Sequence, residues 1–211
     1  MGAGLLAHLP PLPAMTPKRV TVVSGGVALL ALLAVGLVQL AGSAATPAAP
    51  SGLTLAQMRA RLANSPAPLA ALHAQGGTLL PGGLGAIRAR LAALRGEPVV
   101  INKWASWCLP CRSEFGAFQR VSLTRGREVA FIGIDSGDTS QADALAFLRR
   151  FPVSYPSYYD QSGQAGAAVT DSTFTPVTVF YDRSGREYIR QGPYPSQAKL
   201  EQDVERYALD D

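Results

Sequence analysis

The sequence predicts an α/β domain whose central mixed sheet carries helices on both faces. Two apolar runs rich in β-branched residues, 97–105 and 128–135, are each followed by a helical pattern, as in parallel strand–helix–strand units. Two further runs, 176–182 and 186–192, are separated by the turn Arg183-Ser184-Gly185, which predicts an antiparallel hairpin. Parallel units closed by such a hairpin favour a layered α/β architecture.

An uncharged apolar run precedes this domain, from Val20 to Leu40 in a chain of 211 residues. About 20 apolar residues, at a rise of about 1.5 Å each, match the hydrocarbon thickness of a bilayer. Lys18 and Arg19 stand directly before the run, so the positive-inside rule keeps the N-terminus in the cytoplasm. We therefore expect a cytoplasmic tail at 1–19, a transmembrane signal-anchor at 20–41, and the remainder of the chain outside the cytoplasm.

Two other interpretations of this run compete with an uncleaved anchor. The small residues of AGSAATPAAP suit a signal peptidase, although the apolar part of a signal peptide usually spans only about 7–15 residues. A buried helix of a soluble protein would rarely be so long and free of charge. The run does not end in a cysteine, which excludes a lipoprotein anchor. Met15 begins a short cationic lead into the run, so residues 1–14 are either a misassigned start or a short cytoplasmic tail.

Small residues and proline make up residues 42–52, a composition typical of a tether. Residues 53–96 then predict a helical extension that packs on the domain at 97–211. Thr54 and Gln57 form a weak capping box at the start of the first helix of this extension.

Two more helices are expected in the extension, on either side of a breaker. The stretch GGTLLPGG, residues 76–83, is predicted to interrupt them. Helical spacing predicts buried faces that carry Leu69, Leu72 and His73 in the first helix, and Ile87, Leu91 and Leu94 in the second. His73 is expected to be a packed or surface histidine.

The remaining elements follow from caps and breakers. A helix is expected from Cys108 to about Thr124, and Ser140 with Asp143 begins another that stops before Pro152. The other expected pieces are an extended segment at 154–160, one or two helical turns at 163–170, and a last helix that Ser196 caps and that buries Leu200, Val204 and Tyr207.

The charge pattern argues against nucleic-acid binding. The net charge is +4, but without Lys18 and Arg19 the 19 basic residues fall to 17, against 15 acidic ones. No basic stripe or interleaved aromatic ladder accompanies this near balance. A nucleic-acid partner is therefore not expected.

The two cysteines of the chain, Cys108 and Cys111, are the main functional candidates. A structural zinc site needs about four Cys or His ligands, and the two histidines are His8, before the apolar run, and His73. A copper site with two thiolates usually recruits a further histidine, and none follows Cys111. A c-type haem anchor needs His after the second cysteine, where Arg112 stands. No metal and no cofactor are therefore expected.

A structural or peroxidatic role also suits the pair less well than redox activity. A disulfide that closes so short a loop restricts the unfolded chain little. Ala105 stands where a peroxidatic site would place Thr or Ser. Cys108 follows a predicted strand at a predicted helix start, where free N–H groups and the helix dipole stabilise a thiolate. Pro110 suits the first helical turn, and Cys111 lies close enough to form a disulfide with Cys108.

The stretch VVINKWASWCLPCRSEF, residues 99–115, resembles the active-site segment of thioredoxin-fold proteins. It is most similar to the membrane-anchored extracytoplasmic TlpA/ResA/CcmG (DsbE)-like thiol–disulfide oxidoreductases, over roughly residues 97–208. The resemblance implies a thioredoxin-like fold, catalysis by Cys108 and Cys111, and a central insertion at about 138–165. It also implies a cis peptide bond at Thr175-Pro176 and substrate contacts by Trp107, Leu109, Pro110, Thr175 and Pro176.

Two positions near the cysteines bear on proton transfer: Asn102 departs from the family pattern, and Glu114 matches it. Thioredoxin carries a buried Asp where this chain has Asn102, and an amide cannot accept a proton. Glu114 matches a glutamate of the extracytoplasmic branch. It either takes a proton from Cys111, if burial raises its pKa, or is a solvated acid near the start of the helix. Trp104 is expected in the core, and Lys103 is expected to point outward into solvent.

The resemblance implies an enzyme that reduces disulfides in exported proteins, with Cys108 as the attacking thiol and Cys111 as the resolving one. Its electrons would come from a membrane dithiol donor, and apocytochrome c would be among its substrates. Two alternatives stay open: a disulfide-forming oxidase of the same fold, and a redox-inert module that binds peptides beside Pro176. The reduction potential of the pair distinguishes reductase from oxidase.

Overall fold

The structure is a computed structural model that describes residues 52–210. The predicted tail at 1–19, the signal-anchor at 20–41 and the linker up to residue 51 lie outside the described residues. Within residues 52–210, no helix combines the length and the apolar character needed to cross a bilayer.

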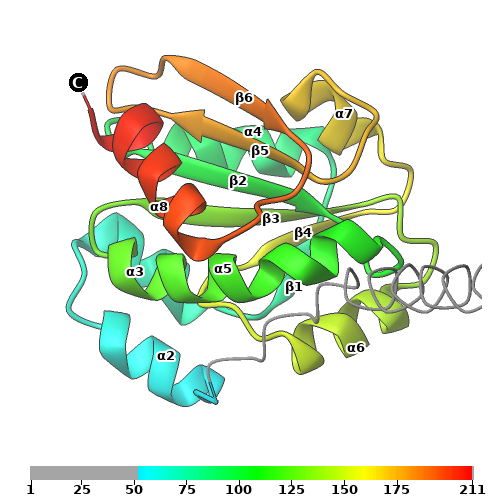
Figure 1. The fold of residues 1–211 in the computed structure, drawn as a ribbon, viewed down its shortest axis with the longest axis horizontal. Helices are drawn as coiled ribbons and strands as arrows, with labels where there is room; N and C mark the ends of the chain where they lie inside the picture. The colour runs from blue at the N-terminus through cyan, green and yellow to red at the C-terminus, as the bar shows by residue number, and fades with distance from the viewer. Residues whose placement is uncertain (1–51, 211) are drawn as a thin grey trace, which may run out of the picture. The chain divides into compact units, whose positions relative to one another are not determined.

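A six-stranded mixed sheet forms the centre of the described domain (Figure 1). In spatial order its strands are β1 (Leu79–Pro81), β4 (Ser157–Asp160), β3 (Ala130–Ser136), β2 (Val99–Trp104), β5 (Val177–Tyr181) and β6 (Glu187–Gln191). The first four strands are parallel, whereas β5 and β6 are antiparallel to their neighbours. The predicted parallel units and closing hairpin are therefore confirmed.

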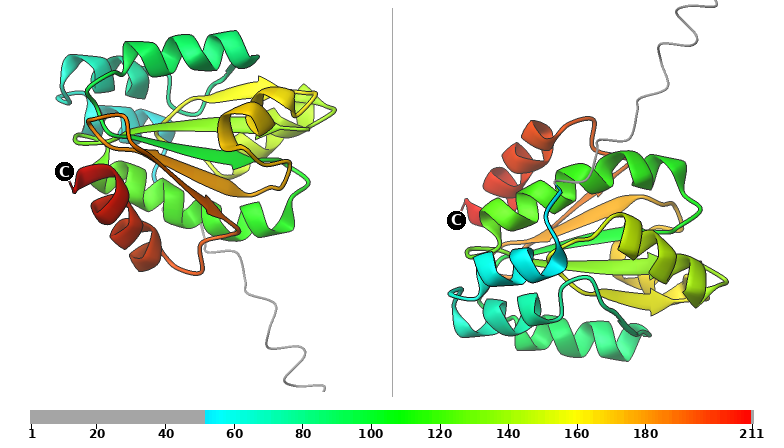
Figure 2. Two further views of the ribbon diagram at one scale, coloured as in Figure 1. Left: turned by 90° about the horizontal axis from the view of Figure 1, so that it is seen from above. Right: turned by 90° about the horizontal axis from the view of Figure 1, so that it is seen from below.

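Helices cover both faces of this sheet, as the sequence predicted (Figure 2). Helices α5 (Leu109–Arg125) and α8 (Gln197–Val204) lie on one face, and α4 (Leu84–Ala93) and α7 (Gln164–Thr170) lie on the other. Side chains of β2 alternate between the two resulting cores: Val100 and Trp104 join the first, and Val99 and Ile101 the second. Because both cores are apolar, every residue of β2 is buried.

The helices that precede the sheet keep the predicted faces and caps. In α2 (Leu55–Leu62) the Thr54 side chain accepts from the N–H of Gln57, and the Gln57 side chain accepts from Thr54, which is a complete capping box. In α3 (Ala67–Ala74) the buried residues are Leu69, Leu72 and His73. The ring nitrogens of His73 lie 3.2 Å from the Ser154 carbonyl oxygen and 2.6 Å from that of Gly126, so His73 is a packed histidine.

The later helices also begin where their caps predicted. Ser140 accepts from the N–H of Asp143 at the start of α6 (Gln141–Arg150), and Ser196 accepts from the N–H of Lys199 at the start of α8. A π-helical turn, η1 (Glu205–Leu209), continues α8 and ends the described chain.

Residues 76–83 correct one prediction, because the stretch expected to be only a breaker contains strand β1. Leu79, Leu80 and Pro81 pair in parallel register with β4, at the edge of the sheet. Three residues flanked by glycines are too short for a period-two pattern, so only the long-range pairing reveals the strand.

Lys103 corrects a second prediction, because its side chain is only 1% exposed instead of pointing into solvent. Lys103 lies on the face of β2 that strand alternation assigns to it, but α7 and the segment after it cover that face. A central strand of an α/β sheet has no solvent-facing side.

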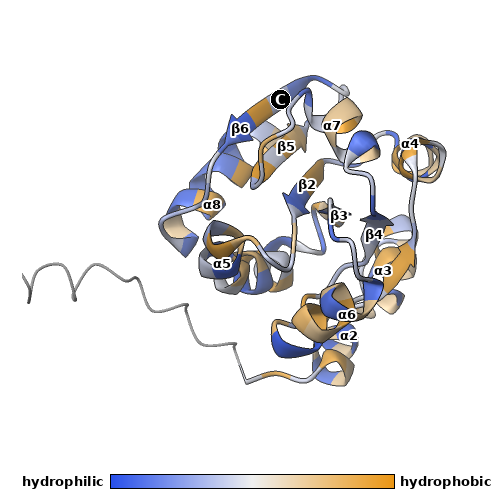
Figure 3. Cartoon of the chain, turned by 90° about the vertical axis from the view of Figure 1, so that its right-hand side faces the viewer, coloured by the Kyte–Doolittle hydropathy of each residue, from blue (hydrophilic) through white to orange (hydrophobic). Residues whose placement is uncertain are grey.

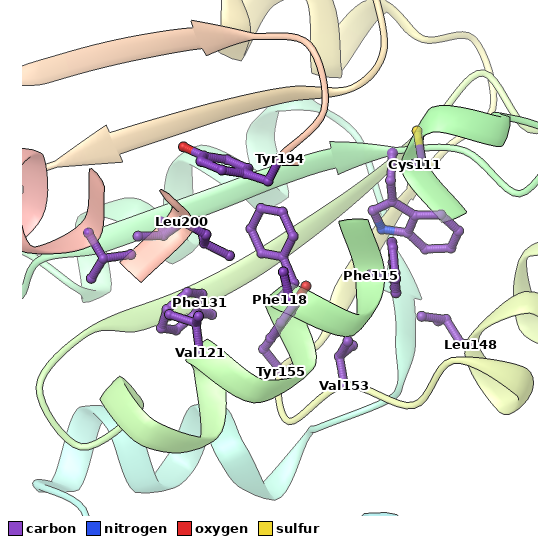
Figure 4. Packing of buried hydrophobic residues seen from close by; sticks show 14 of the residues in the cluster. Cys111, Phe115, Phe118, Val121, Phe131, Leu148, Val153, Tyr155, Tyr194 and Leu200 are labelled. Carbon is purple, nitrogen blue, oxygen red and sulfur yellow. The ribbon is translucent and has the colours of Figure 1, made fainter. Parts of the chain in front are cut away.

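Aromatic residues fill the core between the sheet and α5. Trp104 packs edge-on against Phe115 with 5.2 Å between ring centroids, and it stacks on Phe147 at 4.9 Å. Figure 4 shows Cys111, Phe115 and Phe118 pointing from α5 into this core, with Tyr194 and Leu200 on the opposite side. Trp104 is therefore a core residue, as predicted.

In Figure 3 the edge strand β6 is largely hydrophilic, whereas β5 beside it is mostly hydrophobic.

The close approach of β1 to β4 predicts opposite effects for two nearby glycines. A Cβ at Gly82 would lie 1.6 Å from the Tyr159 carbonyl oxygen, whereas a Cβ at Gly85, inside α4, would meet nothing within 4 Å. We expect Gly82→Ala to lower the free energy of unfolding by about 1–3 kcal/mol, as overpacked sites do. Gly85→Ala should raise it by up to about 1 kcal/mol through helix propensity.

Urea unfolding of the two variants provides the comparison, with Gly85→Ala as the matched control. Equal stability of both variants would contradict the placement of β1 against β4.

Candidate active site

The sheet and helix α5 bring the cysteine pair to the boundary between core and solvent. Strand β2 ends at Trp104, a short loop follows, and Cys108 is the N-cap residue of α5. The backbone N–H of Cys111 donates to Cys108 Sγ at 3.1 Å. Pro110 lies in the first turn, as predicted, where a helix leaves its N–H groups unpaired. This end of a helix favours negative charge on the Cys108 sulfur.

Cys108 and Cys111 form a disulfide, as the sequence analysis anticipated. Cys108 is 3% exposed and Cys111 is fully buried. The sulfur of Cys108 is therefore the one that a partner thiol or disulfide can reach from outside.

The loop before β5 completes the immediate surroundings of the disulfide. Thr175-Pro176 is a cis peptide bond, as expected, and the Thr175 carbonyl oxygen lies 3.8 Å from Cys108 Sγ. A shallow groove of about 400 Å³ runs beside the pair. It is lined by Pro110, Phe174, Thr175, Pro176, Gln191, Gly192 and Pro193.

Large apolar side chains stand exposed around the disulfide. Trp107 is 61% exposed, Leu109 is 72% exposed and Phe174 is 72% exposed. Trp107 and Leu109 were predicted from the sequence, whereas Phe174 was missed although it directly precedes Thr175-Pro176. Clustered exposed apolar residues mark interaction sites, and these three lie around the disulfide. We call Trp107, Leu109 and Phe174 the apolar rim.

Hydrogen bonds hold the loop that joins β2 to α5. The backbone N–H and the hydroxyl of Ser106 donate to Asp138, at 2.7 and 2.8 Å. The guanidinium of Arg112 donates twice to the Ser106 carbonyl oxygen, and Trp107 Nε1 donates to the Gly137 carbonyl oxygen at 3.2 Å. Asp138 was not anticipated, because a lone aspartate in a Gly-Asp turn gives no local sign of a partner distant in sequence.

Glu114 is buried, which excludes the alternative of a solvated acid. It is 0% exposed, and Oε2 accepts from the N–H of Tyr194 at 2.9 Å. Oε1 has no hydrogen-bond partner among the described residues. Burial raises the pKa of Glu114 to about 8, against the lowering effects of the Tyr194 hydrogen bond and the nearby Arg190 charge. Glu114 lies three residues after Cys111, on the same face of α5.

Asn102 is also buried on this side of the sheet. Its Nδ2 donates to the Tyr155 hydroxyl at the long distance of 3.5 Å, and its Oδ1 has no partner among the described residues. Burial raises the pKa of Tyr155, so this hydroxyl stays protonated. Neither group accepts a proton near neutral pH, so of these three buried groups only Glu114 can do so.

Asp135 is a second buried acid that the sequence analysis did not single out. Burial, together with a hydrogen bond to Asp138 and the charges of Asp138 and Asp160, raises its pKa to about 9. It lies near the end of β3, opposite Trp104 in the sheet register. A carboxyl in an otherwise apolar strand could have been noticed from the sequence, but its shifted pKa depends on the loop residues that fold against it.

The described residues offer no place for a metal ion. Within 52–210, no group of three or more His, Cys, Asp or Glu side chains is arranged to hold one. The expected lack of a metal or cofactor stays a prediction.

A sequence profile of the AhpC/TSA family matches residues 78–186. This range begins at β1 and ends in the β5–β6 hairpin, so it includes the disulfide and the cis peptide bond.

Individual relatives support the same grouping. The chain is 34% identical over 112 residues to the "Thiol:disulfide interchange protein DsbE" of Allochromatium vinosum, covering 52% of this chain and 59% of that protein. It is 26% identical over 100 residues to the "Thiol-disulfide oxidoreductase ResA" of Bacillus subtilis, covering 47% of this chain and 55% of that protein. The chain thus spans about half the length of the curated relatives it matches.

Two solved structures share the fold. A DsbF homologue from Corynebacterium diphtheriae is 28% identical with a TM-score of 0.51, covering 55% of this chain and 75% of that one. A thiol:disulfide interchange protein of the thioredoxin family from Chlorobium tepidum is 25% identical with a TM-score of 0.50, covering 55% and 83%. The α/β thioredoxin-like fold is therefore confirmed.

The raised pKa of Glu114 predicts how stability depends on pH. The folded state holds this proton up to about pH 8, whereas the unfolded chain releases it near its ordinary value of 4.5. Its contribution to stability is therefore complete below pH 4.5 and is lost as pH rises toward 8. Glu114→Gln keeps an acceptor for Tyr194 but carries no charge, so the variant should gain stability over the wild type between pH 5 and 9.

Chemical unfolding across this pH range measures the gain, which is bounded by about 1.4 kcal/mol for each unit of pKa shift. Glu128→Gln, at an exposed position just beyond the end of α5, serves as the control and should show no such trend. A constant difference between Glu114→Gln and the wild type would contradict the buried neutral acid.

Proposed function

We propose that this chain, which belongs to the AhpC/TSA family, is a thiol–disulfide oxidoreductase that exchanges its Cys108–Cys111 pair with disulfides of exported proteins. One observation carries the proposal: the disulfide lies at a helix N-terminus with only Cys108 reachable, inside the apolar rim. The names of the DsbE and ResA relatives support the same activity. Ala105, three residues before Cys108, offers no hydroxyl for a peroxidatic reaction.

The exchange reaction follows from the different exposure of the two sulfurs. In the reduced form the Cys108 thiolate attacks one sulfur of the substrate disulfide, which forms a mixed disulfide and releases the other substrate sulfur as a thiolate. The Cys111 thiolate then attacks Cys108 Sγ and expels the second substrate thiol. Two electrons pass to the substrate, and the enzyme is left with the Cys108–Cys111 disulfide.

Glu114 is proposed to move the proton that this second step requires. Cys111 must lose its proton before it attacks, and no solvent reaches it. A carboxylate three residues further along the helix can accept that proton. With a pKa near 8, Glu114 is close enough in acidity to a thiol for transfer in either direction. Its partnerless Oε1 is the available atom.

The substrate is proposed to bind along the groove beside the disulfide. Trp107, Leu109 and Pro110 would contact it from the side of α5, and Thr175 and Pro176 from the loop before β5. Phe174 extends this set because it is as exposed as Leu109 and lines the groove. The lining of this groove carries no charged side chain. Such a surface suits extended or unfolded peptides, as disulfide-bearing substrates are before they fold.

The cellular setting extends this proposal. We infer a reductase anchored by residues 20–41 with its catalytic domain on the extracytoplasmic face of the cell membrane. A membrane dithiol donor would supply its electrons, and apocytochrome c would be one substrate. An oxidase of the same fold would use the same residues with electrons flowing the other way.

The proposal predicts the fate of two cysteine variants of the full chain. Cys108→Ser should lower insulin reduction by dithiothreitol to the rate without the protein, because the remaining thiol, that of Cys111, is buried. Cys111→Ser should also lose turnover but should accumulate a mixed disulfide on Cys108, visible by mass spectrometry as a covalent adduct that thiols remove.

Insulin reduction that is no faster with the wild-type chain than with Cys108→Ser would overturn the enzymatic proposal and leave a redox-inert peptide-binding module. Peptide binding to both serine variants, measured without thiols, is the control that their groove is intact.

A further inference from the structure

Lys103 is a buried charged group that the exchange mechanism does not use. It is 1% exposed and lies in the central strand β2, on the face opposite Glu114 and Asn102. Its neighbour on that face of the same strand is the fully buried Ile101. An ammonium group is retained in such surroundings only where it is hydrogen-bonded, since burying a charge costs much free energy.

The partners of Lys103 lie in the segment that leads to the disulfide. Its Nζ donates to the Ser172 carbonyl oxygen at 2.5 Å and to the Thr170 hydroxyl at 3.4 Å. The Thr170 hydroxyl carries one proton, and its shorter contact is to the Gly166 carbonyl oxygen at 2.8 Å rather than to Ser172 at 3.2 Å. The carbonyl oxygen of Ser172 therefore depends mainly on Lys103 for its hydrogen bond.

Burial and a nearby carboxylate act on the charge of this lysine in opposite directions. Burial lowers the pKa of Lys103, and the nearby Asp160 opposes that effect. Asp160 itself accepts from the N–H of Gly166 at 2.7 Å, in the first turn of α7. Asp160 thus holds the start of α7, and Lys103 holds its end.

The backbone of Lys103 holds the other end of the same segment. In the sheet register Lys103 pairs with Val177, the residue directly after Pro176. The residues between these two attachments include Phe174 of the apolar rim and Thr175, whose carbonyl oxygen faces Cys108 Sγ. Asp171, directly before this segment, has φ +47°, a left-handed conformation that is unfavourable for a residue other than glycine.

We propose that Lys103 is a positioning residue that fixes the segment 172–176 at both ends, so that Phe174 and the Thr175 carbonyl are presented to the substrate. The expected effect of Lys103 on substrate kinetics rests on the proposed function. Its attachment of residues 172–176 does not depend on that function. Lys103 touches neither cysteine, so its loss should weaken substrate binding and leave the chemistry of Cys108 unchanged.

Lys103→Met in the full chain tests this role, because methionine has similar length but no donor. Hydrogen exchange at the amides of residues 172–174 should become about tenfold faster, the loss expected for one hydrogen bond to a charged donor. The Phe174 amide is informative because it donates to Ser172 Oγ at 3.1 Å. KM for a disulfide-containing peptide should rise about tenfold with kcat unchanged. The rate of reaction with dithiothreitol, which needs no groove, should stay the same.

Two further variants separate positioning from general loss of stability. Ile101→Val removes a methyl group from the same strand and face without touching the segment, so it should not change exchange at 172–174. Thr170→Val removes one partner of Lys103 and should change exchange and KM in the same direction as Lys103→Met, by less. It also covers the case in which Lys103→Met fails to fold.

Exchange and KM in Lys103→Met that match those of Ile101→Val would overturn the proposal, as would a fall in kcat alone. If the wild-type chain reduces no disulfide, the proposed function fails, and the hydrogen-exchange comparison still decides whether Lys103 fixes the segment.

Discussion

Strand β2 lies between a parallel neighbour, β3, and an antiparallel neighbour, β5, and helices cover both of its faces. Every side chain of this strand is therefore buried, and each polar one must find its partner within the protein. Asn102 lies on the side of α5, and Lys103 reaches the segment after α7. After Trp104, the last residue of β2, the chain passes through a short loop into the N-terminus of α5, where the reactive pair begins. The position of the disulfide, of its acid and of its substrate-facing loop all follow from this one strand.

Two opposite electrostatic effects operate within the first turns of α5. The helix N-terminus favours negative charge on Cys108, whose sulfur accepts the N–H of Cys111. Further along the helix, burial disfavours negative charge on Glu114 and raises its pKa to about 8, close to that of a thiol. An anionic sulfur near solvent and a buried carboxyl of this acidity are complementary: the first performs attack, and the second, in its ionised fraction, accepts the proton of a thiol that solvent does not reach. This separation depends on the depth of each residue below the surface, which the packing of α5 and Tyr194 determines.

Local patterns were sufficient to predict much of this molecule. The caps at Thr54, Ser140 and Ser196 and the CxxC pair at a helix start are all present. The cis bond before β5, which the family resemblance implied, is present too. Features that depend on distant parts of the chain were not predicted. Strand β1 exists only because β4 pairs with it, and Lys103 is buried only because residues 170–172 fold over it. The raised pKa of Asp135 likewise depends on Asp138 and Asp160, which neighbouring loops bring together.

We propose that this buried framework holds a dithiol that reduces disulfides in other proteins. The direct test of this proposal is the reduction potential of the Cys108–Cys111 pair in the full chain, equilibrated with glutathione or dithiothreitol buffers. We predict a value near that of thioredoxin, about −270 mV, at which the pair donates electrons to most strained or exposed disulfides. A value near about −120 mV, typical of strong disulfide-forming oxidants, would contradict the reductase and reverse the direction of electron flow.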